Sequence, residues 1–169
     1  RKRESRKRHH FRYGFTIHMK YCTCRDSMFG GFTCNDLRDV SPLKRKSVYV
    51  IVVRKRGGKL EDIIKKAKSV IKSLKWPLIE KKALNRISRL STIDRCSVIY
   101  IGSAGTRAES RHTLLGRHTV MFPIWLLIHS GWQLEYRWKT STHPDVLESK
   151  LKSLYMDRYN GHLPALVSR

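Results

Sequence analysis

Apolar side chains recur in short, regular runs from residue 43 onward, and three of these runs predict strands. Residues 47–53 are mostly β-branched and aromatic, a run long enough for a buried strand and too short for a helix. A similar run at 96–101 stops at Gly102, and residues 132–138 alternate apolar and polar side chains as a half-buried strand does. We therefore expect three strands.

Helical spacing fills the stretch between the first two expected strands. Its apolar residues recur every three or four positions along one face, with lysines opposite: Leu60, Ile63, Ile64, Ala67, Val70, Ile71 and Leu74. Pro77 suits the first turn of a second helix in the same stretch. The pattern predicts a helical insertion over 57–95.

Three further helices are expected toward the C-terminus. One spans 106–116 and starts with capping-box spacing, a short apolar helix begins near Pro123, and the last begins at Pro144 and ends by Gly161. This order of elements predicts a mixed α/β fold of the α+β type. We expect a small antiparallel three-stranded sheet flanked by helices, with the helical insertion between the first two strands.

The first part of the chain lacks this regular apolar pattern and is strongly basic. Residues 1–42 show no sustained period of 2 or 3.6, and residues 1–56 contain 16 basic residues and 4 acids. We expect 1–42 to be a basic, partly disordered N-terminal arm, ordered only where DNA or the main domain holds it. The remaining residues, 43–169, are expected to form one domain.

Net charge narrows the classes of function. Lys and Arg number 36 against 13 Asp and Glu, a formal net charge of +23, which disfavours an ordinary metabolic enzyme and indicates a polyanionic partner: DNA, RNA or an anionic membrane surface. No apolar stretch approaches the roughly 18 residues that span a bilayer, and no secretion signal is recognised at the start. We expect a soluble, intracellular protein of the cytoplasm, associated with the nucleoid.

Four cysteines raise the question of a metal site. Cys22, Cys24 and Cys34, with His18 nearby, are ligand types that zinc prefers. The Cys-Thr-Cys spacing is shorter than that of a usual zinc-binding pair, and the sequence has no second closely spaced pair of cysteines. Unpaired cysteines in the arm are therefore favoured over a zinc site, and an intracellular protein is expected to keep its thiols reduced.

Two tyrosines and two later charged residues form an ordered set. Tyr49 and Tyr100 stand on the first two expected strands, Arg111 follows Tyr100 by 11 residues, and Glu148 lies on the last helix. Considered alone, the tyrosines are explained by cross-strand aromatic packing. A lone Glu on the helix of a basic protein is equally explained as a surface ion-pair partner.

The ordered set resembles the GIY-YIG nuclease superfamily over about residues 46–167. The first motif is represented by Ser47-Val48-Tyr49, in which Ser replaces the leading Gly, and the second is the intact Tyr100-Ile101-Gly102. The resemblance implies a metal-dependent DNA endonuclease that hydrolyses phosphodiester bonds by direct attack of water.

This chain departs from the family pattern in three places. The motif tyrosines are 51 positions apart, which exceeds the family's usual hairpin, and an insertion is therefore expected. The His expected one turn after the Arg is replaced by Leu115, which leaves His112 or His118 as substitutes. The late Asn of the family has Val167 close to its place, with Asn160 as an alternative.

The resemblance also implies a role for each site residue. Glu148 would hold one Mg²⁺ (or Mn²⁺) ion, and no second carboxylate is required. The planar guanidinium of Arg111 suits phosphate oxygens. Tyr49 would act as base toward the water, with Tyr100 orienting or sharing it. Helical spacing adds the inference that Arg107, Arg111 and His118 share one helix face.

Further residues are candidates for contact with the DNA backbone. They are the lysines opposite the apolar stripe of the insertion and those that follow it, together with the late Asn: Lys65, Lys66, Lys68, Lys72, Lys81, Lys82 and Asn160. A solvated helix face explains the lysines equally well. Glu135, a polar position of an alternating strand, is expected to face solvent, and Trp125, Trp132 and Trp138 are expected in the core.

We expect a DNA endonuclease of restriction type or from a mobile element, with structure-specific DNA repair as a second nuclease role. Double-stranded DNA is the expected partner, and a palindromic target would imply a homodimer. The rival class is a non-catalytic basic nucleic-acid-binding protein, such as a ribosome-associated or chromatin factor. Glu148 together with Tyr49 separates the two classes, because a binding protein has no need for a carboxylate among its phosphate contacts.

Overall fold

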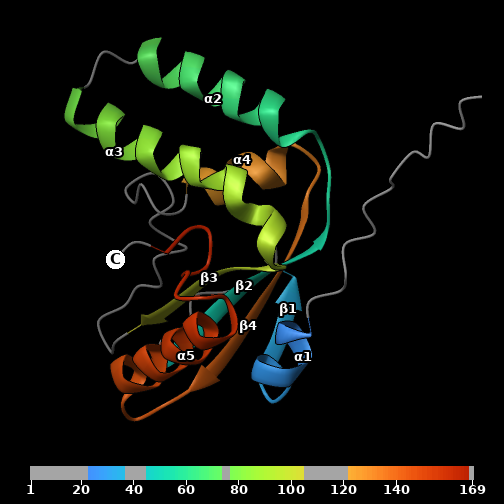
Figure 1. Cartoon of the computed structure of the whole chain (residues 1–169), viewed down its shortest axis with the longest axis vertical. Helices are drawn as coiled ribbons and strands as arrows, with labels where there is room; N and C mark the ends of the chain where they lie inside the picture. The colour runs from blue at the N-terminus through green and yellow to red at the C-terminus, as the bar shows by residue number, and fades with distance from the viewer. Residues whose placement is uncertain (1–22, 37–44, 74–76, 105–121, 168–169) are drawn as a thin grey trace, which may run out of the picture.

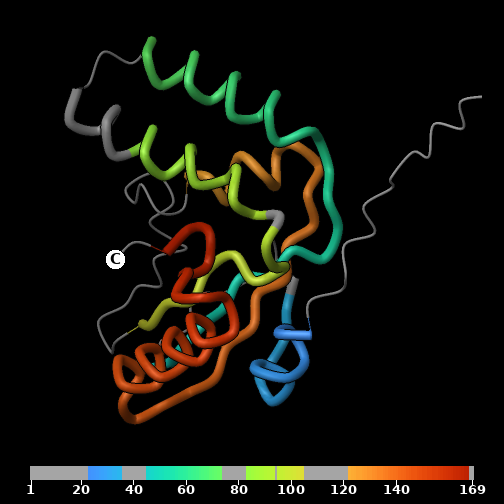
Figure 2. The backbone as a smooth tube through the Cα atoms, viewed as in Figure 1, coloured from blue at the N-terminus to red at the C-terminus, as the bar shows by residue number. Residues whose placement is uncertain are grey.

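The structure is a computed structural model, which describes residues 23–36, 45–73, 77–104 and 122–167 (Figures 1 and 2). Its elements in chain order are α1 (Cys24–Phe29), β1 (Thr33–Asp36), β2 (Ser47–Lys55), α2 (Leu60–Ser73), α3 (Pro77–Ser88), the 3-10 helix η2 (Arg89–Arg95), β3 (Val98–Ala104), α4 (Phe122–His129), β4 (Gln133–Thr140) and α5 (Pro144–Arg158). The expected mixed α/β class is confirmed.

The sheet has four antiparallel strands in the order β1-β4-β2-β3. Strand β2 is central, and its Tyr49 lies opposite Gly102 of β3 and Trp138 of β4. The expectation of three strands is wrong by one, because β1 adds to the free edge of β4. Its sequence, Thr-Cys-Asn-Asp, lacks the apolar alternation by which a strand is recognised.

Helices cover both faces of the sheet, which explains why the first six residues of β2 are all buried. Tyr49 and Ile51 belong to a core cluster with α2, α3 and α4 on one face. Val48, Val50 and Val52 belong to a second cluster with α1 and α5 on the other face. Figure 1 shows these two groups of helices on opposite sides of the strands.

The helical insertion between the first two expected strands is confirmed. Helix α2 buries Ile63, Ala67 and Ile71, three residues of the predicted apolar stripe, and α2 packs against α3. Trp132 donates a hydrogen bond from its indole N–H to the Gly58 carbonyl at 2.9 Å, and this bond ties the start of the insertion to the residue that precedes β4. The helix expected over 106–116 lies outside the described residues.

Residues 23–36, which the sequence placed in the N-terminal arm, are folded against the sheet. Cys24 and Phe29 of α1 are fully buried. Arg137 of β4 donates hydrogen bonds to the backbone carbonyls of Arg25 and Phe29, at 3.1 and 3.2 Å. The rest of the proposed arm, 1–22 and 37–42, lies outside the described residues.

The expectation that Glu135 faces solvent is wrong. Its residue exposure is 8%, and its carboxylate is ion-paired with the guanidinium of Arg137 two residues along β4. The two side chains point to the sheet face that α1 covers, so the alternation of β4 is real but its polar face is buried. Trp132 is buried as expected, and Trp125 and Trp138 are partly buried against the same core.

The chain after α5 wraps around the outer edge of β3. The Leu166 N–H donates to the carbonyl of Ile99 at 2.9 Å, which continues the hydrogen bonding beyond the last strand. Arg86 and Arg89, from the end of the insertion, donate to the carbonyls of Leu166 and Val167 at 2.9 and 3.0 Å. Across the described part of the chain, every helix is too short or too polar to cross a membrane.

Candidate functional site

Three tyrosine rings form a row across the central strands. The Tyr49 ring stacks on that of Tyr100, with centroids 5.7 Å apart and planes inclined by 23°. On its other side the Tyr49 ring stacks on Tyr136, at 5.7 Å and 27°. The two motif tyrosines are therefore neighbours on one face of the sheet, as their expected strands implied, and Tyr136 is an addition that the motifs did not indicate.

Gly102, the last residue of the second motif, makes room for this row. A Cβ atom built at Gly102 would lie 2.6 Å from Cε1 of Tyr100, 3.0 Å from its hydroxyl oxygen and 3.0 Å from Cζ of Tyr49. Contacts this short between carbon atoms are strongly repulsive. A larger residue would force at least one of the two tyrosine rings to move, because both rings close over the α-carbon of Gly102.

The tyrosines are deeply buried. Tyr49 is 1% exposed, Tyr100 5% and Tyr136 1%, and all three belong to the core cluster beneath α2, α3 and α4. Burial raises the pKa of Tyr136 above its ordinary value, because a phenolate is poorly solvated there. The row therefore contributes to the core of the domain, whatever further role its hydroxyl groups have.

Ser47, the first residue of β2, was expected to replace a glycine of the first motif. It is fully buried opposite Ala104 of β3 and Thr140 of β4. Its hydroxyl has no hydrogen-bond partner among the described residues. The side chain is thus tolerated at this position without making a polar contact that would explain its presence.

Glu148 lies on α5, which packs against β3 and β2 on the sheet face opposite the tyrosine row. Its carboxylate is ion-paired with Lys152, one helical turn later, and the two side chains are 19% and 24% exposed. The structure therefore brings Tyr49 and Tyr100 together and places Glu148 on the other face.

Glu148 and Tyr49 nevertheless lie at the same end of the sheet. Helix α5 begins just after Thr140, which is opposite Ser47 in the ladder. Glu148 is four residues into the helix, about 6 Å along its axis. Tyr49 is two residues from Ser47, about 7 Å along β2. A group that contacted both residues would have to reach around this end of the sheet, because α5 and the tyrosine row lie on opposite faces.

Glu148 offers one carboxylate to a metal ion. A single carboxylate suits Mg²⁺, which keeps most of its waters. Among the described residues no group of three or more His, Cys, Asp and Glu side chains converges, so a site with several protein ligands is not formed there. The ammonium of Lys152 occupies one position a cation would take at this carboxylate.

Arg86 is a cation that motif reasoning missed. Burial lowers the pKa of its guanidinium below the ordinary value, the like charge of Arg89 lowers this pKa further, and Tyr100 opposes both effects. Arg86 donates to the Leu166 carbonyl, and the Leu166 N–H bonds to Ile99, so one loop residue links Arg86 to the strand that carries Tyr100. Its position in the insertion, outside both motifs, gave the sequence no signal for this proximity.

The structure places some of the remaining candidate residues and not others. Lys65, Lys66, Lys68 and Lys72 are exposed on α2. Asn160 is exposed just after α5, with a φ of 52° in the left-handed region. Arg107, Arg111, His112, His118 and Cys22 lie outside the described residues, as do the side chains of Lys81 and Lys82. The catalytic role of Arg111 therefore stays a prediction, as does the absence of a disulfide or metal at Cys22.

Cys24, a ligand of the zinc site that was considered and not favoured, is buried against residues that are not metal ligands of that site. Its Sγ lies 3.1 Å from the Tyr159 hydroxyl and accepts a hydrogen bond from Arg158 at 3.4 Å. Cys34 is exposed on β1, and partial desolvation of its thiol together with the nearby Glu135 raises the pKa of that thiol. No protein-family model, curated protein or solved structure matches this chain.

Proposed function

We propose that this protein is a metal-dependent DNA endonuclease with a GIY-YIG-like core, which hydrolyses phosphodiester bonds by direct attack of water. The observation that supports the proposal best is the stacking of Tyr49 on Tyr100 over Gly102, at 5.7 Å between ring centroids. Both motifs of the resemblance thus meet at one place on adjacent strands, although their tyrosines are 51 positions apart.

The proposed reaction site is the end of the sheet nearest Tyr49 and the start of α5. A phenol hydroxyl hydrogen-bonds the attacking water, Arg86 lies near the second tyrosine, and Glu148 supplies the carboxylate. When bound, a Mg²⁺ or Mn²⁺ ion at Glu148 would polarise a phosphate oxygen. Lys152, which now pairs with this carboxylate, would have to yield that position.

DNA is the proposed substrate because of the charge. The chain has a net charge of +23, and α2 exposes four lysines on the side away from its buried Ile63 and Ala67. Clustered exposed cations bind nucleic acid by releasing condensed counterions. An intracellular location, a restriction-type or mobile-element role and a homodimer on palindromic targets belong to the same proposal.

The test is nicking of supercoiled plasmid by purified protein with Mg²⁺, with Mn²⁺ and with EDTA. Tyr49→Phe, Tyr100→Phe and Glu148→Gln should slow nicking by at least 10²-fold while DNA affinity is retained. Tyr136→Phe is the matched control, since it removes the same hydroxyl from the next ring of the row. Its nicking rate should stay close to that of the parent protein.

Absence of metal-dependent nicking on plasmid and on branched DNA would refute the nuclease. Equal loss of activity in Tyr136→Phe and Tyr49→Phe would instead assign the tyrosines to packing. Each variant also needs its melting temperature measured, because all three rings are buried.

A non-catalytic nucleic-acid-binding protein is the second candidate. Burial of both motif tyrosines and the Glu148–Lys152 ion pair favour it, because each gives a possible catalytic side chain a structural role. This candidate predicts tight, salt-sensitive DNA binding that is indifferent to EDTA, with no cleavage product at any metal concentration.

A further inference from the structure

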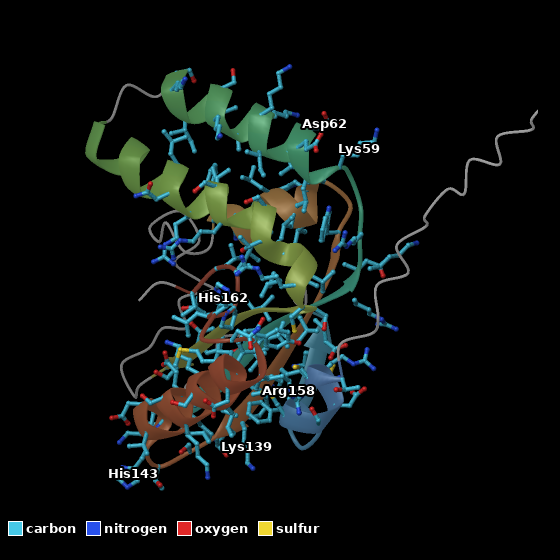
Figure 3. All side chains as sticks on the ribbon, in the orientation of Figure 1. Lys59, Asp62, Lys139, His143, Arg158 and His162 are labelled. Atoms are coloured by element: carbon cyan, nitrogen blue, oxygen red, sulfur yellow. The ribbon has the colours of Figure 1, made fainter. Side chains whose placement is uncertain are left out.

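A hollow of about 410 Å³ lies between η2 and the loop that follows α5. Its walls include Arg89 and Thr92 from the insertion and Gly161, His162, Pro164 and Val167 from the C-terminal loop. Two segments about 70 residues apart in the sequence therefore build it together. Figure 3 shows the labelled His162 between α5 and the helices of the insertion.

The polar lining of the hollow is cationic or neutral. Arg89 and His162 contribute nitrogen donors, and no Asp or Glu occurs among the described residues that line it. The described hydrogen bond of Arg89 uses one guanidinium N–H, to the Val167 carbonyl at 3.0 Å, and a guanidinium has five. The hollow thus offers donors for an anion without a competing carboxylate.

Its walls are held in place by contacts that reach the tyrosine row. Arg86 and Arg89, one helical turn apart, donate to consecutive carbonyls of the loop, those of Leu166 and Val167. The Leu166 N–H in turn bonds to Ile99, the residue before Tyr100. The loop is therefore fixed against the edge of β3, and the hollow is preorganised beside the second motif.

We propose that this hollow binds a phosphate group of a nucleotide unit, with the guanidinium of Arg89 and the ring of His162 as its polar contacts. Arginine matches phosphate oxygens with a planar pair of donors, and a hollow of this size accepts a phosphate with its sugar. The identification of the ligand as DNA backbone rests on the proposed function. A free nucleotide has the same phosphate chemistry, and the experiment separates the two sources.

The first measurement is duplex binding in a salt series. A double variant, Arg89→Gln with His162→Gln, is compared with Arg95→Gln with His143→Gln, a matched pair of exposed residues that do not line the hollow. His143 lies at the other end of α5 (Figure 3). We expect the hollow variant alone to lose about tenfold in affinity, with the slope of log K against log salt reduced by about 0.9.

The second measurement is the NMR shift of the His162 ring on addition of inorganic phosphate, a 5′-mononucleotide or a short duplex. A shift with duplex but not with millimolar mononucleotide identifies the polynucleotide backbone as the source. A shift with mononucleotide and no effect of the double variant on duplex binding identifies a free nucleotide. No shift with any probe overturns the proposal, as does equal loss of duplex affinity in both double variants.

Misfolding of a variant and failure of the nuclease proposal can each be distinguished from failure of this inference. If Arg89→Gln unfolds the C-terminal loop, Arg89→Lys, which keeps the charge, and His162→Gln alone supply the same comparison. Binding is measured without metal, so a protein that never cleaves DNA but shifts His162 refutes only the nuclease. A protein that cleaves DNA normally but shows no shift of the His162 ring with any probe refutes only this inference.

Discussion

Arg137 and Glu135, two residues apart on β4, form an ion pair in which each side chain is only 10% exposed. The same guanidinium donates to two carbonyls of α1, so the pair both satisfies a buried carboxylate and fixes the N-terminal segment to the sheet. Buried charges are retained in proteins when their hydrogen bonds are complete. This pair therefore helps to hold 23–36 on the domain, together with the β1–β4 ladder and the contacts of Cys24 with α5 and Tyr159.

Replacing Arg137 by Met should destabilise the protein by about 3–5 kcal/mol, because Glu135 would remain buried without its partner. The double variant Glu135→Leu with Arg137→Met should recover most of that loss. Urea unfolding gives both free energies, and limited proteolysis near Arg25 reports release of α1. If the free energy of unfolding of Arg137→Met lay within about 1 kcal/mol of the parent value, the pair would not be buried in solution.

Gly102→Ala should destabilise the fold by about 1–3 kcal/mol, since a methyl group there meets the rings of Tyr100 and Tyr49. Gly31→Ala is the control, because nothing lies within 4 Å of the Cβ position at Gly31. Thermal and urea unfolding of the two variants measure the difference. Equal stability of both would mean that the tyrosine rings do not close over Gly102.

Glu148→Gln and Lys152→Gln distinguish a catalytic carboxylate from a structural ion pair. As a helical pair four residues apart, the two side chains stabilise α5 by about 0.3–0.5 kcal/mol, so both variants should keep nearly the parent melting temperature. If Glu148 holds the metal, only Glu148→Gln abolishes nicking, whereas Lys152→Gln preserves it. Normal nicking by purified Glu148→Gln protein would remove the catalytic assignment.

Deletion of 1–22 should leave the melting temperature unchanged and flatten the salt dependence of DNA binding, because this segment contains eight basic residues and one acid. Deletion of 1–36 should lower the melting temperature as well, because it removes β1 and the buried side chains of Cys24 and Phe29. Calorimetry and a salt titration of both truncations test this. Equal melting temperatures would place 23–36 outside the folded domain.

The local pattern of apolar residues was sufficient to predict most of the described helices and strands. The run at 47–53 became β2, because a strand buried on both faces is recognisable as an uninterrupted β-branched segment. The stripe that includes Ile63 and Ala67 became the inner face of α2, because helical periodicity directly records which side is buried. These elements need no knowledge of the partners they pack against.

The candidate site was predictable to a smaller degree. The proximity of Tyr49 and Tyr100 followed from placing both on adjacent strands, and the structure agrees. The position of Glu148 on the opposite face did not follow, because its place in the chain says only that it is on a helix. Arg86 was missed since its neighbour Tyr100 belongs to a different element.

Local patterns in the sequence were enough to predict the chain order of the central strands and helices, the insertion, and the adjacency of Tyr49 and Tyr100. Tertiary structure alone decided that β1 joins the sheet, that Glu135 is buried and that Arg86 and Arg89 hold the C-terminal loop. The physical reason is the range of the interactions. Periodicity reports the surroundings of a residue within a few positions, whereas α1 reaches Arg137 from more than 100 residues away, and only the folded chain shows which polar side chains it covers.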